Sequence, residues 1–181
     1  MKVVLRGRRS GLLWLLTMLG VVGVTLSALT VAFGSPLPSA VQAKLSAART
    51  ADAVQVIEGY RQGERAALLT LDADVLAQVA VFARDDALDD LARRVRDLRA
   101  QGLYQKLAVD SFAVVHVDGA ASLAVTELDV TTEEVLTVET YPQSPAAAPA
   151  NDRRTSTWQV VYHLVQEAGR WRVAQVTAVE K

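Results

Sequence analysis

The stretch that decides the fold is TWQVVYHLVQEAGRWRVAQVTAVE, residues 157–180. Val, Thr, Tyr and Trp dominate two runs, and the EAGR between them, residues 167–170, has the composition of a tight turn. This pattern predicts an antiparallel hairpin. Four apolar residues are expected on the face opposite the Trp and Tyr side chains: Val161, Val165, Val176 and Ala178. Both faces of the hairpin are therefore expected to be covered, one by helices and one by a partner or a second protomer.

A second pair of strands is predicted upstream of this hairpin. Residues 104–117 and 121–140 are β-branched and largely alternating, and Asp118-Gly119 between them is a hairpin signal. The segment YPQSPAAAPANDRR, residues 141–154, contains three prolines and predicts a flexible loop. The sequence therefore predicts four antiparallel strands.

Three helices are predicted before the strands, over residues 50–69, 72–82 and 86–102, the last ending at a glycine. The apolar stripe of the first helix is interrupted at Gly63 and Glu64. Helices followed by antiparallel strands are typical of an α+β domain. We expect a cone-like arrangement, with about three helices packed on one face of a curved antiparallel sheet.

The N-terminal region has the pattern of a membrane segment. Lys2, Arg6, Arg8 and Arg9 precede an uncharged apolar run over residues 12–34. As a helix this run reaches roughly 35 Å, enough to cross a hydrocarbon core of ~30 Å. The basic residues before it predict a cytoplasmic N-terminus.

This pattern divides the chain into four parts. We expect a cytoplasmic basic segment (1–11), a transmembrane helix (12–34), a Pro/Ser/Ala tether (35–49) and an extracytoplasmic domain (50–181). The alternative is a cleaved secretory signal, because residues 41–43 (VQA) offer small residues at a suitable spacing. The length of the apolar run favours the uncleaved anchor, and both interpretations place the domain outside the cytoplasm. The use of Ala, Val, Leu, Arg and Asp suggests a bacterial source.

Three stretches of the soluble part resemble a known domain. ALLTLDADVL (67–76), LRAQGLYQKLAVDSFAVVHVDG (98–119) and the closing stretch 157–180 resemble the intermembrane-space (IMS) domain of plastid-division proteins. That domain is similar in plan to the nuclear-transport-factor-2-like (SnoaL-like) cone superfamily. The resemblance implies a cone fold. In the plastid proteins the domain docks a partner membrane protein, which implies a protein-interaction domain here, whereas a role in cell division does not follow.

Catalytic residues are not indicated by any motif. The chain has no cysteine and two histidines, His116 and His163. Enzymes of the cone superfamily usually use a carboxylate or an Asp–His pair inside the cone, for which Asp110, Glu127 and Asp129 are the nearest candidates. Because these residues carry no recognisable motif, we expect the protein not to be an enzyme.

Neither metals nor nucleic acids are expected as ligands. The histidines lack metal-ligand spacing, and the acidic pairs at 85–86, 89–90 and 133–134 are interpreted as solvated charges. No cofactor is predicted. The chain carries 20 acidic against 19 basic residues, and four of the basic ones precede the apolar run, so the remainder is acidic and binding of nucleic acid is disfavoured.

The sequence therefore predicts a single-pass membrane protein whose extracytoplasmic cone domain is a scaffold or adaptor at the cell envelope. The expected partner is an envelope protein or a second copy. The residues predicted to bind it are Tyr162, His163, Trp171 and Arg172. One alternative is a module that binds a small apolar or lipid ligand, which requires an aromatic-lined cavity of roughly 300 Å³ or more. A less favoured alternative is an enzyme with a carboxylate–His pair in that cavity.

Overall fold

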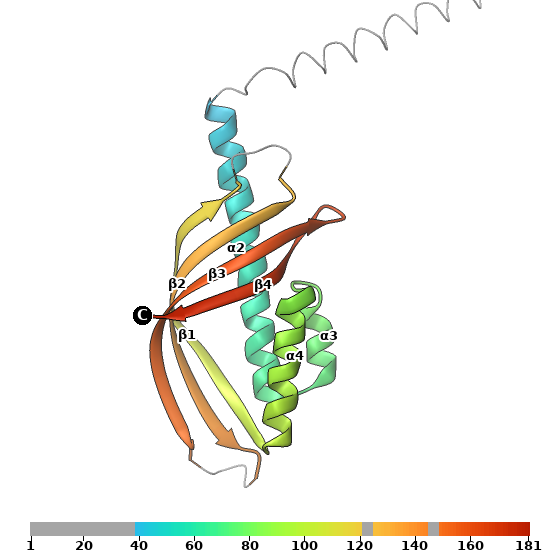
Figure 1. Ribbon diagram of the computed structural model, residues 1–181, viewed down its shortest axis with the longest axis vertical. Coiled ribbons are helices and arrows are strands. Elements are labelled where there is room, and N and C mark those ends of the chain that lie inside the picture. Colours follow the sequence, from blue (N-terminus) through green and yellow to red (C-terminus); the bar gives the residue numbers. More distant parts are fainter. Residues whose placement is uncertain (1–38, 121–124, 145–148) are drawn as a thin grey trace, which may run out of the picture. The chain divides into compact units, whose positions relative to one another are not determined.

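The helices and strands follow the predicted order, helices first (Figure 1). The computed structural model describes residues 39–120, 125–144 and 149–181 of the 181-residue chain. The predicted segments 1–11 and 12–34 lie outside these ranges, so their topology stays a prediction. Within the described ranges no helix is both long enough and apolar enough to span a membrane.

Three helices form: α2 (Ser39–Thr70), α3 (Ala73–Val79) and α4 (Asp85–Ala100). The predicted tether over 35–49 is corrected, because α2 begins at Ser39 rather than near residue 50. The reason is that the tether sequence after Ser39, AVQAKLSAAR, consists mainly of strong helix formers. The side chain of Asp72 caps α3 by accepting a hydrogen bond from Asp74 N–H.

Four strands form one antiparallel sheet in the order β1-β2-β3-β4. They are β1 (Leu103–Asp118), β2 (Glu127–Pro142), β3 (Asp152–Glu167) and β4 (Arg170–Glu180). The closing hairpin and the antiparallel pairing of β1 with β2 are confirmed, but β2 begins at Glu127 rather than at residue 121, so the predicted turn at Asp118-Gly119 does not join the two strands directly. The predicted loop 141–154 is shorter than expected, because Glu139 pairs with Arg153 and Thr140 with Asp152 in the ladder, and the strands extend into both ends of it.

An irregularity in β4 changes which face its residues occupy. Leu164 pairs with Val173 but His163 pairs with Gln175, so Ala174 is an extra residue in β4. A bulge of one residue moves every later side chain to the other face. Val176 and Ala178 therefore lie on the same side as Tyr162, which corrects their predicted placement on the opposite face.

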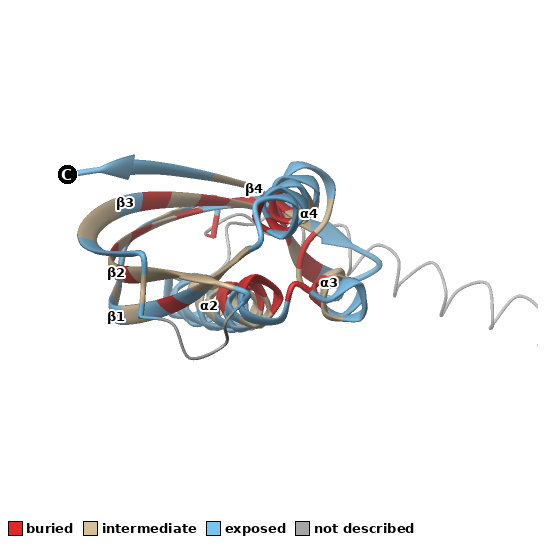
Figure 2. Cartoon of the chain, turned by 90° about the horizontal axis from the view of Figure 1, so that it is seen from below, coloured by how far each residue is buried: buried red, intermediate tan, exposed pale blue. Residues whose placement is uncertain are grey.

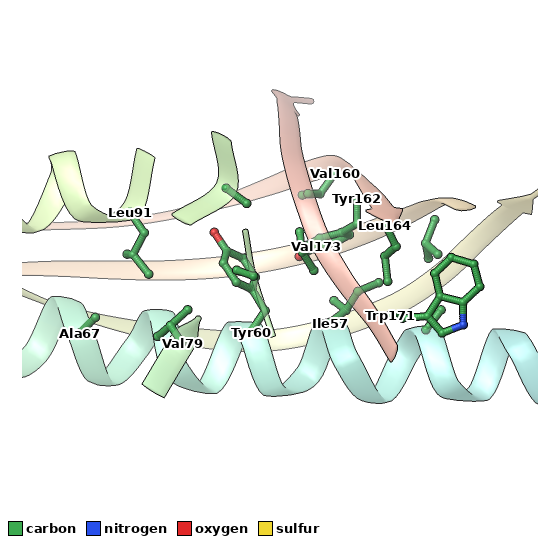
Figure 3. Close-up of a cluster of buried hydrophobic side chains, with 14 of the residues drawn as sticks. Ile57, Tyr60, Ala67, Val79, Leu91, Val160, Tyr162, Leu164, Trp171 and Val173 are labelled. Carbon is green, nitrogen blue, oxygen red and sulfur yellow. The ribbon is translucent and has the colours of Figure 1, made fainter. Parts of the chain in front are cut away.

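The helices pack against the concave face of the sheet. Figure 2 shows the sheet curling from β1 to β4 around an interior where the buried residues gather. This interior contains Ile57 of α2, Leu91 of α4, and Tyr162, Leu164 and Val173 of the sheet, each at most 2% exposed. Figure 3 shows these side chains between α2 and the strands. The curved sheet and its helices therefore enclose one hydrophobic core.

The interruption in the stripe of α2 marks a close helix contact. A Cβ built on Gly63 would lie 2.6 Å from a methyl group of Val79, which ends α3 and is buried. A Cβ on Gly59 would likewise meet the ring of Phe82 at 2.5 Å. The two glycines are thus required because α3 and the residues after it pack directly on the α2 backbone.

We expect Gly63→Ala to destabilise the domain even though alanine favours a helix. Overpacking costs typically 1–3 kcal/mol, while the gain in helix propensity is about 1 kcal/mol. Urea unfolding measured beside the exposed control Gln62→Ala tests this. A Gly63→Ala protein as stable as the wild type would contradict the close contact.

Candidate functional site

The concave face of the sheet holds a cleft of about 370 Å³. Its walls come from α2, α4 and all four strands. The lining residues are Tyr60, Arg61, Glu64, Ala87, Asp90, Leu91, Arg94, Leu107, Leu136, Val138, Trp158, Val176 and Ala178. Most of the wall is aliphatic or aromatic, and the polar residues come from the two helices. An apolar cleft with a few grouped polar residues is the usual form of a binding site.

A wider hollow of about 600 Å³ lies at the edge of β1, near the C-terminal ends of α2 and α4. Its lining includes Leu69, Arg99 and Lys106. Arg99 donates a hydrogen bond to the carbonyl of Leu71 and so closes the end of α2. No ionisable residue that lines this hollow belongs to the buried charge network described below. We therefore regard the smaller cleft as the better candidate for a binding site.

A buried network of charged and polar groups lies beneath the cleft. Arg61 Nη1 donates to Glu64 Oε2 at 2.5 Å, and Arg61 Nη2 donates to Glu134 Oε2 at 2.7 Å. Glu134 Oε1 also accepts from Tyr162 Oη at 2.5 Å and from Thr132 Oγ1 at 2.8 Å. Glu134 is 0% exposed. The network therefore ties α2 to β2 and β3.

Arg94 of α4 connects this network to the surface. Its Nη1 donates to Glu64 Oε1 at 2.8 Å, and its Nη2 lies 3.4 Å from Gln105 Oε1. About half of the Arg94 side chain is exposed, whereas Glu64 is almost completely buried. Two arginines thus balance two glutamates. The cleft has a charge-balanced polar floor, and two exposed side chains of opposite charge, Arg94 and Asp90, also line it.

The pKa shifts follow from burial and pairing. Burial alone would raise the pKa of Glu64, but the neighbouring Arg61 and Arg94 lower it below its ordinary value. Burial would lower the pKa of Arg61, but Glu64, Tyr162 and Glu134 raise it above its ordinary value. Burial raises the pKa of Tyr60 and of Tyr162, so both hydroxyl groups stay protonated. The glutamate, the guanidinium and the phenols therefore keep their usual protonation at neutral pH.

The buried position of Glu134 corrects a prediction from the sequence. The pair at 133–134 was expected to be solvated, and Glu133 does lie near the surface, where it contacts Lys181. Glu134 instead points inward, on the same side of β2 as Val130 and Thr132. Its burial is possible because Arg61 and two hydroxyl groups satisfy its carboxylate.

The four residues predicted to bind a partner do not share one surface. Tyr162 and Trp171 point into the core and are at most 8% exposed (Figure 3). His163 and Arg172 lie on the convex face, each with about one third of the side chain exposed. Tyr162 supports the network through Glu134, and Trp171 fills the core. Binding of a partner by these residues stays a prediction, and only His163 and Arg172 are accessible for it.

The histidines lie outside the cone. His163 Nδ1 is 2.7 Å from Asp129 Oδ1, and His116 Nε2 is 2.8 Å from Asp118 Oδ1. On the convex face of the sheet, Asp129 and His163 line a small hollow of about 210 Å³, together with Glu127. Neither histidine of the chain lines the cleft. The carboxylate–His pair that the enzyme hypothesis requires inside the cone is therefore not formed there.

The remaining carboxylate candidate also has a structural contact. Asp110 Oδ2 accepts a hydrogen bond from Thr137 Oγ1 at 2.6 Å. Across the part of the chain that the structure describes, no three His, Asp or Glu side chains are grouped for metal binding. Sequence reasoning missed Arg61, Glu64, Glu134 and Arg94 as a connected set. The break in the α2 stripe at Glu64 was the one available signal.

The arrangement of helices and sheet defines the class of fold, an α+β cone. The chain is similar to the crystal structure of the intermembrane space region of chloroplast protein ARC6, with a TM-score of 0.61 and 13% identity. That match covers 74% of this chain and 96% of the other. The fold predicted from the resemblance is therefore confirmed.

A second solved structure is also similar. It is a ketosteroid isomerase-like protein from Erwinia carotovora atroseptica, with a TM-score of 0.42 and 14% identity, covering 70% of this chain and 94% of the other. No protein-family model matches the sequence. A search of curated proteins also finds no match.

The ion pairs of Glu64 make the stability of the domain depend on pH in the acidic range. Because its folded pKa is lowered below the unfolded value of about 4.3, its contribution to stability is complete above that pH. The contribution is lost as the pH falls through the folded pKa. We expect the stability of Glu64→Gln to fall less than that of the wild type as the pH drops below about 4.3, measured by urea unfolding over this acidic range.

Glu180 provides a matched control. Ser156 and Arg154 lower its pKa, but it lies at the surface, where solvent screens the interaction. Glu180→Gln should therefore change the acid response less than Glu64→Gln does. Equal acid responses for the wild type and Glu64→Gln would contradict an ionised, paired Glu64.

Proposed function

We propose that this protein is a non-catalytic adaptor of the cell envelope, whose cone domain takes an apolar part of a partner protein into the cleft between α4 and the concave face of the sheet. One observation supports this proposal most strongly. Half-buried aliphatic and aromatic side chains of the strands, among them Leu136, Val138 and Trp158, remain around an open volume of about 370 Å³. Covering such apolar surface with an apolar group of a partner lowers the free energy of the complex.

The polar floor supports binding rather than catalysis. Each carboxylate of Glu64 and Glu134 already interacts with a guanidinium. The hydroxyl group of Tyr162 is also engaged by Glu134. A general base or nucleophile needs a reacting group free to meet a substrate. These groups instead hold the walls in place, and Arg94 offers one exposed cation at the cleft end.

A protein partner is favoured over a free ligand for two reasons. The cleft is partly open to solvent, because Ala178 and about half of the Arg94 side chain are exposed, which suits a side chain carried on a peptide. The resemblance to the IMS domain also implies docking of a membrane protein, and the similar solved structure is the intermembrane space region of chloroplast protein ARC6. The large apolar residues exposed elsewhere in the described ranges are scattered: Val41, Leu69, Val81, Val114, Val115 and Val179.

The proposed location rests on the sequence of the N-terminal region. The apolar run over residues 12–34 follows four basic residues, a pattern that anchors the chain with its N-terminus in the cytoplasm. The cone domain would then lie outside the cytoplasm, tethered to the membrane. A tethered domain meets envelope proteins at a raised effective concentration, so a modest affinity is sufficient for binding.

A second candidate is a module for a small amphipathic ligand. The cleft volume lies within the usual range for small-molecule sites, and Tyr60 and Trp158 contribute aromatic surface to it. An apolar body would contact the strands while an acidic group met Arg94. Native mass spectrometry of the purified chain distinguishes the two candidates, because only this one predicts a bound small molecule of constant mass.

Site-specific photocrosslinking in the native membrane tests the adaptor proposal. We expect a photoreactive amino acid at Ala178, in the cleft wall, to yield one discrete protein adduct. The charge-introducing variant Val138→Arg, at a half-buried position of the cleft wall, should abolish that adduct, because it places a cation in the apolar wall. The same photoreactive group at Val115, which is 62% exposed and outside the cleft, is the control. Equal adducts at both positions, or an adduct that persists in a folded Val138→Arg protein, would contradict the proposal.

A further inference from the structure

The last strand leaves an open edge beside the cleft. The strand order places β4 at one end of the sheet. Its first half is covered, because Val173 N–H donates to the carbonyl of Phe82 at 2.8 Å and Arg84 N–H donates to the carbonyl of Val173 at 2.9 Å. Beyond Val173, β3 is the one described segment that pairs with β4. An unpaired strand edge is a template for another strand.

The ladder shows which residues face the open edge. Lys181 N–H donates to the carbonyl of Thr157 at 3.0 Å, so Lys181 is a hydrogen-bonded partner of β3. In an antiparallel pair such residues alternate with residues whose N–H and C=O groups point away from the partner. Glu180, Ala178 and Val176 therefore direct their backbone donors and acceptors toward the open edge.

The same residues border the cleft. The side chains of Val176 and Ala178 line it, on the same side of β4 as Tyr162. In a strand paired with β4, the residue directly opposite Val176 or Ala178 would have its side chain on that same face. A new strand would therefore place every second side chain over the cleft while its backbone satisfied the open edge.

We infer that the segment of the partner that this domain binds is an extended strand, which adds antiparallel to β4 at Val176–Glu180 and inserts alternate apolar side chains into the cleft, so that the residues entering the cleft are also those that hydrogen-bond to β4. This inference rests on the proposed function and specifies its partner. Alternating N–H and C=O groups at this spacing match an extended polypeptide, and the aliphatic walls require apolar residues at every second position.

A second copy of this chain fits the site less well. Pairing β4 with β4 of another copy would bring only Val176 and Ala178 across the edge, and these side chains are too small to fill a cleft of about 370 Å³. A heterologous strand can carry leucine or phenylalanine at the same positions. The open volume therefore favours a different chain as the occupant.

The test titrates the full-length protein in detergent micelles with a capped octapeptide that alternates leucine with threonine. Nuclear magnetic resonance detects binding up to a Kd of ~1 mM. We expect N-methylation of the leucine amides, which removes the donors facing β4, to weaken binding at least about tenfold. N-methylation of the threonine amides, which face away from β4, should leave the affinity unchanged.

Protein variants provide a second measurement. Ala178→Pro removes one N–H from the open edge and none from the ladder with β3, a position where proline is tolerated. We expect it to weaken peptide binding about tenfold, whereas Gln175→Val, which lies opposite His163 on the convex face and outside the added strand, should retain binding. If Ala178→Pro does not fold, the methylated peptides decide the question with the wild-type protein.

Three results would overturn the inference. Equal binding of all three peptides would mean docking by side chains without strand addition, and would leave the proposed cleft function intact. Failure of every peptide to bind would reject strand addition, while the crosslink at Ala178 decides the cleft function separately. If the protein is a dimer in which the backbone amides of Val176 and Ala178 are already protected from hydrogen exchange, then a second copy of the chain pairs with the β4 edge.

Discussion

The domain depends on one buried ion pair, between Arg61 of α2 and Glu134 of β2. Both side chains are almost entirely removed from water, so burying either charge without the other would destabilise the folded domain. The guanidinium also holds Glu64, and the carboxylate also accepts from Tyr162 and Thr132. Because these contacts join the central helix to the two central strands, they set the distance between α2 and the concave face, and so the space in which the cleft lies.

This buried network distinguishes the domain from one whose core is entirely apolar. An apolar interior could close further by repacking, whereas a paired set of charges has few alternative arrangements of similar free energy. Arg94 extends the set from Glu64 to the surface. The cleft therefore has a fixed polar floor beneath aliphatic walls, and Val176 and Ala178, at the free edge of β4, line it. The open backbone edge of β4 and the apolar cleft together favour an extended polypeptide over a compact ligand.

Much of the fold could be predicted from the sequence, because local patterns specify its elements. Asp72 as a cap, Gly102 as a helix end and the turn at 167–170 agree with the structure. The set of charged site residues could not be predicted. Glu134 resembles a solvated strand residue until its partner is known, and that partner, Arg61, lies 73 residues away. The bulge at Ala174, which turns Val176 and Ala178 toward the cleft, likewise depends on tertiary packing.

The most direct test of this account is the free energy of unfolding of Arg61→Met beside that of Arg61→Met combined with Glu134→Met. Removing the arginine alone leaves a buried, unpaired carboxylate, which should cost about 3–5 kcal/mol. Removing both charges should restore a large part of that loss, because no unpaired ion remains. If the double variant is no more stable than Arg61→Met, or if Arg61→Met alone costs nothing, the ion pair is not the constraint on which the cone depends.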